Sequence, residues 1–529
     1  MKFLVYLLCF LCLSGCGGST SSKSVENSSP SVSGKVSTSG GTAVAGAVVM
    51  LTGSSSSTTT TDSNGIYRFT AVNNGTYQVT AAKTGYFFTP SVHSVTVGTA
   101  DVIERNFTAA DSNTGPATLG SWTWVSGDST VNRVGTYGAK GVASPLNCPG
   151  ARGGAMSWSD KSGNLWLFGG YGIDSTGTTG HLNDLWKFDG ANWTWVAGGN
   201  LSNRSGAYGT KGVPAGSNEP GARDCGSTWT DAGGNLWLFG GIGKDANGVQ
   251  GYLGDLWKFD GTAWTWVSGD TTADGGAVYG LKGFPSATNK PGAREAAVAW
   301  VDRLGRLWLF GGSGKDAAGV LGHLNELWCF DGAAWTWVSG TTIANDLSDY
   351  GTLGLASPSN APWGRDITKT WVDPQGDAWF FGGCTNHGLL SDLWKFDGGN
   401  WTWVSGSNVF NSVGIYGNAA TARPGARSGS IFWMDSNGCL WLYGGFGVDG
   451  GYNGEMNDLW KFDGVGWKLI AGNGTSNQSP VYGTKGSPSA ANTPARIFGS
   501  ASWVVNGTVW AFGGYVPGGM TNVLWKYAP

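Results

Sequence analysis

From residue 120 onward, short apolar runs alternate with tight turns in a fixed order. One representative unit has apolar runs at residues 153–158, 164–168, 184–188 and 192–196. Turns rich in Asp and Gly join the first run to the second and the third to the fourth, as β-hairpins require. The pattern predicts a four-stranded antiparallel meander with strands a, b, c and d. Runs such as LWLF are apolar on both faces, so each sheet must be covered on both sides.

This unit recurs along the chain. A Gly-Gly pair ends strand b each time, and its first residue is Gly169, Gly240, Gly311, Gly382, Gly444 or Gly513, at successive intervals of 71, 71, 71, 62 and 69 residues. Repetition at a nearly fixed period indicates a solenoid or a propeller. Blades arranged radially cover both faces of every sheet. The sequence therefore predicts a six-bladed β-propeller over residues 120–529.

The first copy of strand d stands in an unusual place. The stretch SWTWVSGD at 121–128 matches the end of later units, but no unit precedes it, and the last unit stops at LWKYAP without a strand d. Residues 122–125 would supply that missing strand. We therefore expect an N-terminal strand to close the propeller and to remove its exposed edge.

The units resemble the kelch motif of galactose-oxidase-like propellers. The resemblance rests on the Gly-Gly pair, on an aromatic residue in strand c (Phe188, Phe259, Phe330, Phe396, Phe462 and Tyr527) and on a Trp in strand d (Trp193, Trp264, Trp335, Trp401 and Trp467). The units exceed the roughly 50 residues usual for kelch because the connection from strand d to the next strand a is long. The resemblance implies that most of the 30 Trp residues pack between blades.

Residues 32–110 have a different pattern. Short runs with a period of two, such as AGAVVMLTG and GTYQVTAAKTGYF, alternate with Gly, Asn and Asp turns. The runs predict a small antiparallel β-sandwich, so the fold class is all-β. Together with the DSNGIY turn, they resemble the carboxypeptidase regulatory-like domain, which implies a non-catalytic spacer or binding module. Residues 111–119 are expected to form a linker.

The N-terminus predicts export. An apolar run from Phe3 to Leu13 is too short to span a bilayer comfortably and leads to Leu-Ser-Gly-Cys at 13–16. This tetrapeptide resembles the bacterial lipobox, so residues 1–16 are expected to be a lipoprotein signal with Cys16 as the lipidated residue. Residues 17–31 form a Ser-rich tether. Gly17 after Cys16 implies the outer membrane, on its periplasmic or cell-surface side.

Composition limits the partners. Charged residues make up 13% of the chain and the formal net charge is -3, so no strong field attracts nucleic acid or an acidic membrane surface. We expect a monomer that contacts the membrane only through its lipid anchor. The five cysteines after Cys16 lack a CxxC spacing, and isolated residues are favoured over a Cys148–Cys225 disulfide.

One Arg begins the innermost strand of every unit: Arg152, Arg223, Arg294, Arg365, Arg427 and Arg496. These residues could form a cationic ring for a carboxylate or sulfate ligand. Alternatively, each could bond neighbouring carbonyls or an acid such as Asp184. A structural role is favoured, because a ligand lacks the sixfold symmetry of the ring.

Better binding candidates break that symmetry on the face where the long b–c and d–a connections emerge. His181, Tyr252 and His323 precede the first Leu of strand c in three successive units. Asp224, Glu295 and Asp366 follow the Arg of strand a, where units one, five and six have Gly153, Ser428 and Ile497. Such groups can hydrogen-bond or stack on a sugar, although local ion pairing with the Arg also explains the acids.

These candidates favour a non-enzymatic protein that binds a glycan or a protein. Galactose-oxidase-like copper centres need two His and two Tyr, but His181, His323 and His387 fall in different units and His93 lies in the sandwich. We therefore expect no metal and no cofactor. Two alternatives stay open: a metal-independent sugar-modifying enzyme similar to sialic-acid mutarotases, with Arg294 and Glu295 as a candidate pair, and a structural envelope protein.

Overall fold

The computed structural model describes residues 30–38, 40–83, 86–90, 92–111, 120–416, 421–449, 452–472, 474–494 and 498–528. The chain forms two compact units, Met1–Asn113 and Thr114–Pro529. All regular elements in the described ranges are β-strands, which confirms the predicted all-β class. Within these ranges, no helix is long and apolar enough to cross a membrane. The expected signal, Cys16 and nearly all of the tether lie outside the described residues, as do residues 112–119 of the linker.

The N-terminal unit is a sandwich of two four-stranded sheets. One sheet has the order β4 (Ile66–Phe69), β1 (Val32–Thr38), β8 (Phe107–Asp111) and β6 (Tyr86–Thr89). The other has the order β3 (Ser57–Thr60), β2 (Val48–Gly53), β5 (Gly75–Ala82) and β7 (His93–Val97). Val36, Val49 and Val79 are fully buried between them. The period-two pattern thus places alternate side chains in a shared core.

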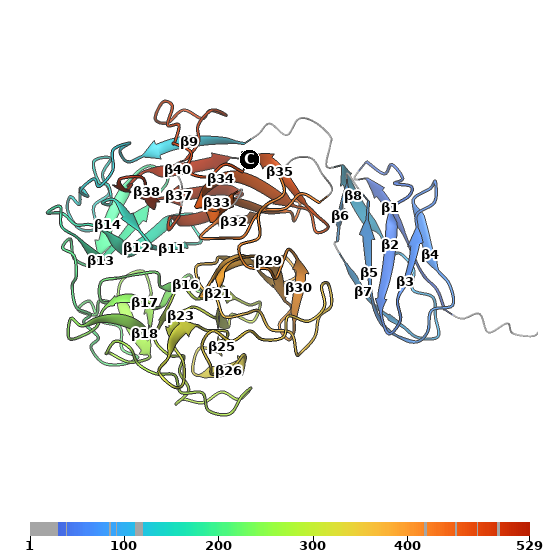
Figure 1. The fold of residues 1–529 in the computed structure, drawn as a ribbon, viewed down its shortest axis with the longest axis horizontal. Helices are drawn as coiled ribbons and strands as arrows, with labels where there is room; N and C mark the ends of the chain where they lie inside the picture. Colours follow the sequence, from blue (N-terminus) through green and yellow to red (C-terminus); the bar gives the residue numbers. More distant parts are fainter. Residues whose placement is uncertain are drawn as a thin grey trace, which may run out of the picture. The chain divides into compact units, whose positions relative to one another are not determined.

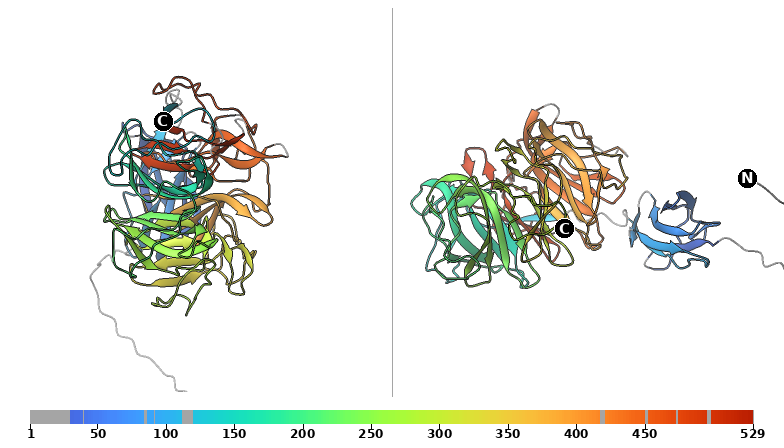
Figure 2. Two further views of the ribbon diagram at one scale, coloured as in Figure 1. Left: turned by 90° about the vertical axis from the view of Figure 1, so that its left-hand side faces the viewer. Right: turned by 90° about the horizontal axis from the view of Figure 1, so that it is seen from below.

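The second unit contains six successive antiparallel blades of a propeller, and the strands of blades three and six are each divided between two sheets (Figure 1; Figure 2 shows them from two further sides). Blade one comprises β10 (Arg152–Gly153), β11 (Met156–Ser159), β12 (Leu165–Ile173), β13 (Thr179–Phe188) and β14 (Trp193–Ala197). Blade two comprises β15 (Arg223–Asp224), β16 (Ser227–Thr230), β17 (Leu236–Lys244), β18 (Gln250–Phe259) and β19 (Trp264–Ser268). Blade three comprises β20 (Arg294–Glu295), β21 (Val298–Val301), β22 (Leu307–Phe310), β23 (Ser313–Lys315), β24 (Leu321–His323), β25 (Leu327–Phe330) and β26 (Trp335–Ser339).

The remaining blades follow the same order. Blade four comprises β27 (Thr370–Val372), β28 (Ala378–Thr385), β29 (Gly388–Phe396) and β30 (Trp401–Ser405). Blade five comprises β31 (Arg427–Ser428), β32 (Ile431–Met434), β33 (Leu440–Asp449), β34 (Tyr452–Phe462) and β35 (Trp467–Ala471). Blade six comprises β36 (Ala501–Val505), β37 (Thr508–Phe512), β38 (Tyr515–Val516), β39 (Gly519–Met520), β40 (Leu524–Ala528) and the N-terminal β9 (Ser121–Ser126).

The pairing of β9 with β40 confirms the predicted role of the displaced strand. The two strands are antiparallel, with Trp122 opposite Tyr527 and Trp124 opposite Trp525 (Figure 1). Trp122 is buried, and its ring also packs against Tyr443 of blade five at a centroid distance of 5.0 Å. The edge of β40 is therefore paired, and the Trp122 side chain from the N-terminal strand β9 joins blades five and six.

Neighbouring blades share apolar cores and a repeated hydrogen bond. The indole Nε1 of Trp158 in blade one donates to the carbonyl of Trp237 in blade two at 2.8 Å. Trp503 of blade six makes the equivalent bond to the carbonyl of Trp166 in blade one at 3.1 Å. Blade six therefore contacts blade one in the same way as blade one contacts blade two. Most of the large Trp side chains serve this packing, as the sequence predicts.

Described parts of the long connections between blades pack against the outer strands. Asn218 lies in the connection to blade two, and its side-chain nitrogen donates to the carbonyl of Trp264 in β19 at 2.9 Å. Equivalent bonds run from Asn147, Asn289, Asn360 and Asn492 to the outer strands of their blades. These connections thus protect sheet edges, which accounts for their repetition in the sequence.

Candidate functional site

The innermost strands surround a central cavity of about 410 Å³. All six blades contribute to its lining, with Ser157, Thr228, Ala299, Thr370, Phe432 and Ser502 among the contributing residues. This volume falls within the range of about 300–1,000 Å³ that is typical of small-molecule sites. Only small polar and apolar groups recur along the wall, so any specificity must come from residues that differ between blades.

Each innermost strand bends at one residue with a positive φ. Those residues are Gly154, Cys225, Ala296, Ile367, Gly429 and Gly499. The bend interrupts the predicted strand a, which the structure divides into β10 and β11 in blade one. The N–H of Cys225 donates to the carbonyl of Gly154 at 2.8 Å, and the N–H of Ala296 donates to that of Cys225 at 2.7 Å. These bonds join successive blades, and they hold even the β-branched Ile367 at a φ of 49°.

Three positions per blade form what we call the cavity rim. They are the residue before each bend in strand a (Gly153, Asp224, Glu295, Asp366, Ser428 and Phe498), its partner in strand b (Tyr171, Ile242, Ser313, Cys384, Phe446 and Tyr515) and the partner of that residue in strand c (His181, Tyr252, His323, Leu389, Glu455 and Met520). Directly paired residues project from the same face of a sheet. The rim therefore contains all six predicted ligand-binding residues.

The predicted residues interact across blade interfaces. His181 of blade one lies beside Asp224 of blade two, with its Nδ1 atom 3.4 Å from Oδ1. His323 of blade three lies beside Asp366 of blade four, with Nε2 3.4 Å from Oδ2. Both distances exceed the roughly 2.7–2.9 Å of a charge-assisted hydrogen bond. Among the described residues, Oδ1 of Asp224 and Oδ1 of Asp366 have no hydrogen-bond partner, although both side chains are buried.

Glu295 lies between these two pairs in the order of blades. Burial raises its pKa to about 7, and the nearby carboxylates of Asp224 and Asp366 contribute to this shift. Burial alone would lower the pKa of His323, but contacts with Asp366 and Cys384 outweigh it and raise that pKa to about 9. Blades one to four thus form a polar arc, and charges within it contribute to the shifted pKa values of Glu295 and His323.

An aromatic arc, formed by blades five, six and one, completes the rim. Phe446 packs against Phe498 at a centroid distance of 5.7 Å, and Phe498 packs against Tyr515 at 6.2 Å. Tyr171 follows in blade one and meets His181 edge-on at 5.3 Å, where the polar arc begins. Burial raises the pKa of Tyr515, and the charges of Asp224 and Glu295 raise it further. The Tyr515 hydroxyl is therefore within electrostatic reach of the polar arc.

Blade six corrects one alignment made from the sequence. Phe498 pairs with Tyr515 as Gly153 pairs with Tyr171, so Phe498, and not Ile497, occupies the rim position of strand a. Arg496 and Ile497 themselves lie outside the described residues. One additional residue between Arg496 and Trp503 shifts this blade relative to the others. A shift of one residue exchanges the two faces of a strand.

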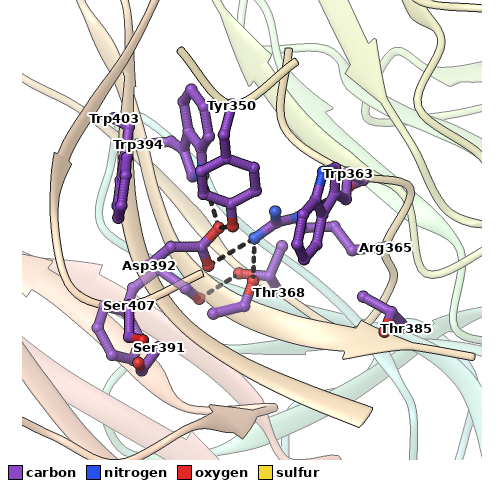
Figure 3. A network of polar contacts seen from close by, with 12 residues as sticks. Tyr350, Trp363, Arg365, Thr368, Thr385, Ser391, Asp392, Trp394, Trp403 and Ser407 are labelled. Carbon is purple, nitrogen blue, oxygen red and sulfur yellow. Dashed lines mark hydrogen bonds and ion pairs between the residues drawn. The ribbon is translucent and has the colours of Figure 1, made fainter. Parts of the chain in front are cut away.

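The other five ring arginines are buried in ion pairs. Arg152, Arg223, Arg294, Arg365 and Arg427 bind Asp184, Asp255, Glu326, Asp392 and Asp458, and their side chains are at most 1% exposed. In blade four, the Arg365 guanidinium bonds Asp392 at 2.7 Å and the Gly382 carbonyl at 2.9 Å, while the Tyr350 hydroxyl also donates to Asp392 (Figure 3). Except for Nη2 of Arg365, which has no hydrogen-bond partner among the described residues, the nitrogens of these guanidinium groups bond within the blades, which favours the structural interpretation of the ring.

Lys369 adds a cation to the cavity wall. Its side chain is accessible to solvent inside the cavity, yet protein surrounds it, and this desolvation lowers its pKa. The equivalent residue in blade one, Met156, is buried within the sheet. In blade four β27 begins only at Thr370, so Lys369 precedes the ladder. Only one feature of the sequence points to Lys369, namely a charge at a position that is Met, Ser, Val or Ile in blades one, two, three and five.

The aromatic arc and Cys384 are further site residues that the sequence does not single out. Apart from Phe498, they share a simple signal, because the rim position of strand b immediately follows the Gly-Gly pair in every blade. It carries Tyr, Ile, Ser, Cys, Phe and Tyr in order. In the described chain, Cys148, Cys225, Cys329, Cys384 and Cys439 are free thiols, so Cys148 and Cys225 do not form a disulfide.

Comparison with known proteins identifies the first unit. Residues 31–110 match the family model of the carboxypeptidase regulatory-like domain, so the N-terminal sandwich is a domain of that type. No curated protein matches the chain. A solved structure titled "Structure of YjhT" is similar at 14% identity with a TM-score of 0.43, and the match covers 73% of this chain and 95% of that one. A likeness of this size carries no functional argument.

Proposed function

We propose that the protein binds a neutral, hydroxyl-rich glycan at the cavity rim. The observation that supports this most strongly is the pair of buried carboxylate oxygens, on Asp224 and Asp366, that lack hydrogen-bond partners among the described residues. A buried acceptor without a donor costs about 1–3 kcal/mol, and a ligand hydroxyl would recover this energy. The aromatic arc opposite offers an apolar surface for the C–H face of a sugar ring.

The charge of the rim argues for a neutral ligand. The five described ring arginines are buried and already paired with acids, which disfavours their binding a carboxylate or sulfate. An anionic sugar would also approach the carboxylates of Asp224 and Asp366. Binding of a protein partner is less favoured, because Asp224 and Asp366, which carry the unsatisfied oxygens, directly precede residues that line a cavity.

The sequence also supports a proposal for the location of the protein in the cell. We propose that the blades belong to the kelch type and that Cys16 carries a lipid, which anchors the protein in the bacterial outer membrane. The carboxypeptidase regulatory-like domain would then act as a spacer between the membrane and the binding face. Replacement of Cys16 by Ser should release the protein from the membrane fraction or leave an unprocessed precursor, and unchanged lipid labelling would contradict the anchor.

A second candidate function is metal-independent modification of a sugar. One observation favours it: the pKa of Glu295 is raised to about 7, as a general acid or base working at neutral pH requires. Incubation of the protein with a glycan that it binds distinguishes the two functions. Unchanged sugar by NMR spectroscopy supports binding alone, whereas a changed anomeric ratio or a new product supports catalysis.

The direct test of the binding proposal is an array of neutral and anionic oligosaccharides probed with the full chain. Retention of neutral glycans, in preference to sialylated or sulfated ones, supports the proposal. Retention of anionic glycans alone, or of none, would contradict it.

A further inference from the structure

Three metal-ligating side chains of different chemistry meet at the interface of blades three and four. They are His323, Asp366 and Cys384, and their ligating atoms all lie within 4.8 Å of one another. Nothing in the sequence groups them, because His323 belongs to a different blade from the other two. The contact arises because strand c of each blade lies beside strand a of the next at the rim.

The backbone fixes the position of each of these residues. Asp366 and Cys384 exchange two backbone hydrogen bonds of 3.0 Å, so their side chains project from the same face of the sheet. The N–H of His323 donates to the side-chain oxygen of Asn345 at 2.9 Å, and its carbonyl accepts from the N–H of Asn345 at 2.7 Å. Little reorganisation is needed to present the three side chains together, which favours tight binding.

The separation of the ligating atoms suits a tetrahedral ion. Ligands that are about 2.0–2.3 Å from Zn²⁺ lie about 3.3–3.8 Å from one another. The 3.4 Å between Nε2 of His323 and Oδ2 of Asp366 falls in this range and is long for a hydrogen bond between them. Asp366 is 93% buried, since its exposed fraction is 7%, and its Oδ1 atom has no hydrogen-bond partner among the described residues. This orphaned acceptor is a second observation that points to a missing partner.

We propose that His323, Asp366 and Cys384 bind a divalent transition-metal ion, with Zn²⁺ or Co²⁺ as the best match. Imidazole and thiolate ligands select such ions over Ca²⁺ and Mg²⁺, which prefer oxygen ligands. Three protein ligands leave a fourth coordination position, which a water molecule or a ligand hydroxyl can fill. Metal binding displaces the thiol proton of Cys384 and the extra proton that the His323 imidazole holds, and both protons pass to the solvent.

A second cluster, Asp224, Cys225 and Glu295, serves as the internal comparison. Its ligating atoms also lie within 4.8 Å of one another, but it contains no imidazole. Cys225 belongs to the backbone ring between blades, at a φ of 53°, and neighbours Asp224 directly in the chain. The cluster at His323 is therefore the better transition-metal site, and Cys225 provides a matched control thiol.

The test uses Co²⁺ because thiolate coordination produces a charge-transfer band in the near ultraviolet. Titration of the reduced, metal-free full chain should show one bound Co²⁺ with this band. Cys384→Ser should abolish the band and His323→Gln should weaken Co²⁺ binding at least about tenfold, whereas Cys225→Ser should leave both unchanged. Absence of the band from the wild type, its survival in Cys384→Ser or its loss in Cys225→Ser would overturn the assignment.

A second measurement avoids any variant that folds poorly. Zn²⁺ added to the unaltered chain should slow alkylation of one thiol, and peptide mapping should identify that thiol as Cys384. Equal alkylation rates for Cys384 with and without Zn²⁺ would overturn the proposal. The inference does not rest on the glycan proposal, because both experiments measure metal binding without any other ligand.

Discussion

The ring of Tyr515 occupies the space that a side chain at Gly153 would need. A Cβ atom built on Gly153 would collide with the Cε2, Cζ and Cδ2 atoms of that ring. The absence of a side chain in blade one therefore allows an aromatic residue of blade six to lie across the interface at the rim. The polar arc has no side chain at Gly153 in blade one, and this leaves room for the Tyr515 ring of the neighbouring aromatic arc.

Replacement of Gly153 by Ala should displace the Tyr515 ring. Overpacking of this kind costs about 1–3 kcal/mol of unfolding free energy. In a Tyr515→Ala background, the same replacement should cost much less, because the colliding ring is gone. Urea unfolding of the four proteins gives the coupling energy directly. Equal costs of Gly153→Ala in both backgrounds would mean that the two residues do not interact as described.

Replacement of Trp122 by Ala should strongly destabilise the propeller. Trp122 is 5% exposed and packs against Tyr443 and Tyr527, so its loss leaves a cavity at the interface of blades five and six. Truncation of a buried Trp costs about 3–5 kcal/mol. Leu146→Ala is the control, because Leu146 is 77% exposed and its truncation should change stability by less than about 0.5 kcal/mol. Similar unfolding midpoints for the two variants would show that β9 contributes little.

Removal of one partner of a ring ion pair should be far more harmful than removal of both. Asp392→Leu leaves the fully buried Arg365 guanidinium uncompensated, at a cost of about 3–5 kcal/mol. The double variant Arg365→Met, Asp392→Leu should recover most of this loss, since no buried charge remains (Figure 3). Thermal unfolding measures both. A double variant that is less stable than Asp392→Leu would show that Arg365 stabilises the blade through its carbonyl contacts alone.

The pKa of Glu295 predicts a specific pH dependence of stability. Its pKa is raised from 4.5 to about 7 in the folded protein, so the folded state holds the proton more tightly than the unfolded state. The resulting stabilisation is complete below pH 4.5 and is lost as the pH rises through 7. The Gln side chain of Glu295→Gln does not titrate, so this variant does not lose that stabilisation as the pH rises. Relative to the wild type, it should therefore gain up to about 3 kcal/mol of unfolding free energy between pH 5 and pH 8. A difference that does not change with pH would contradict the shifted pKa.

The sequence predicts the propeller well because its signals are local and repeated. The Gly-Gly pairs define the blades, and the displaced tail at Trp122 identifies its partner strand by similarity alone. The sequence predicts the polar arc for the same reason, since Asp224, Glu295 and Asp366 are acidic at a position where the other blades carry uncharged residues. The repeat in the sequence therefore predicts both the propeller and the positions at which individual blades depart from the repeat.

The sequence does not predict which of the positions that differ between blades come into contact in the folded protein. His323 and Cys384 belong to different blades, and only the packing of strand c against the next strand a brings them together. Phe498 was missed because one additional residue shifts the register of blade six, and a one-residue shift reverses the faces of a strand. Contacts across blade interfaces depend on three-dimensional packing, which periodicity along a single unit does not encode.

The central claim is that the polar and aromatic arcs bind one neutral glycan together. The most direct test is calorimetric titration of the best neutral glycan from the array into the wild type, into Asp366→Asn and into Tyr515→Ala. Each replacement should weaken binding at least about tenfold, or about 1.4 kcal/mol, while the melting temperature confirms an intact fold. Unchanged affinity in both folded variants would place the binding site elsewhere and contradict the account.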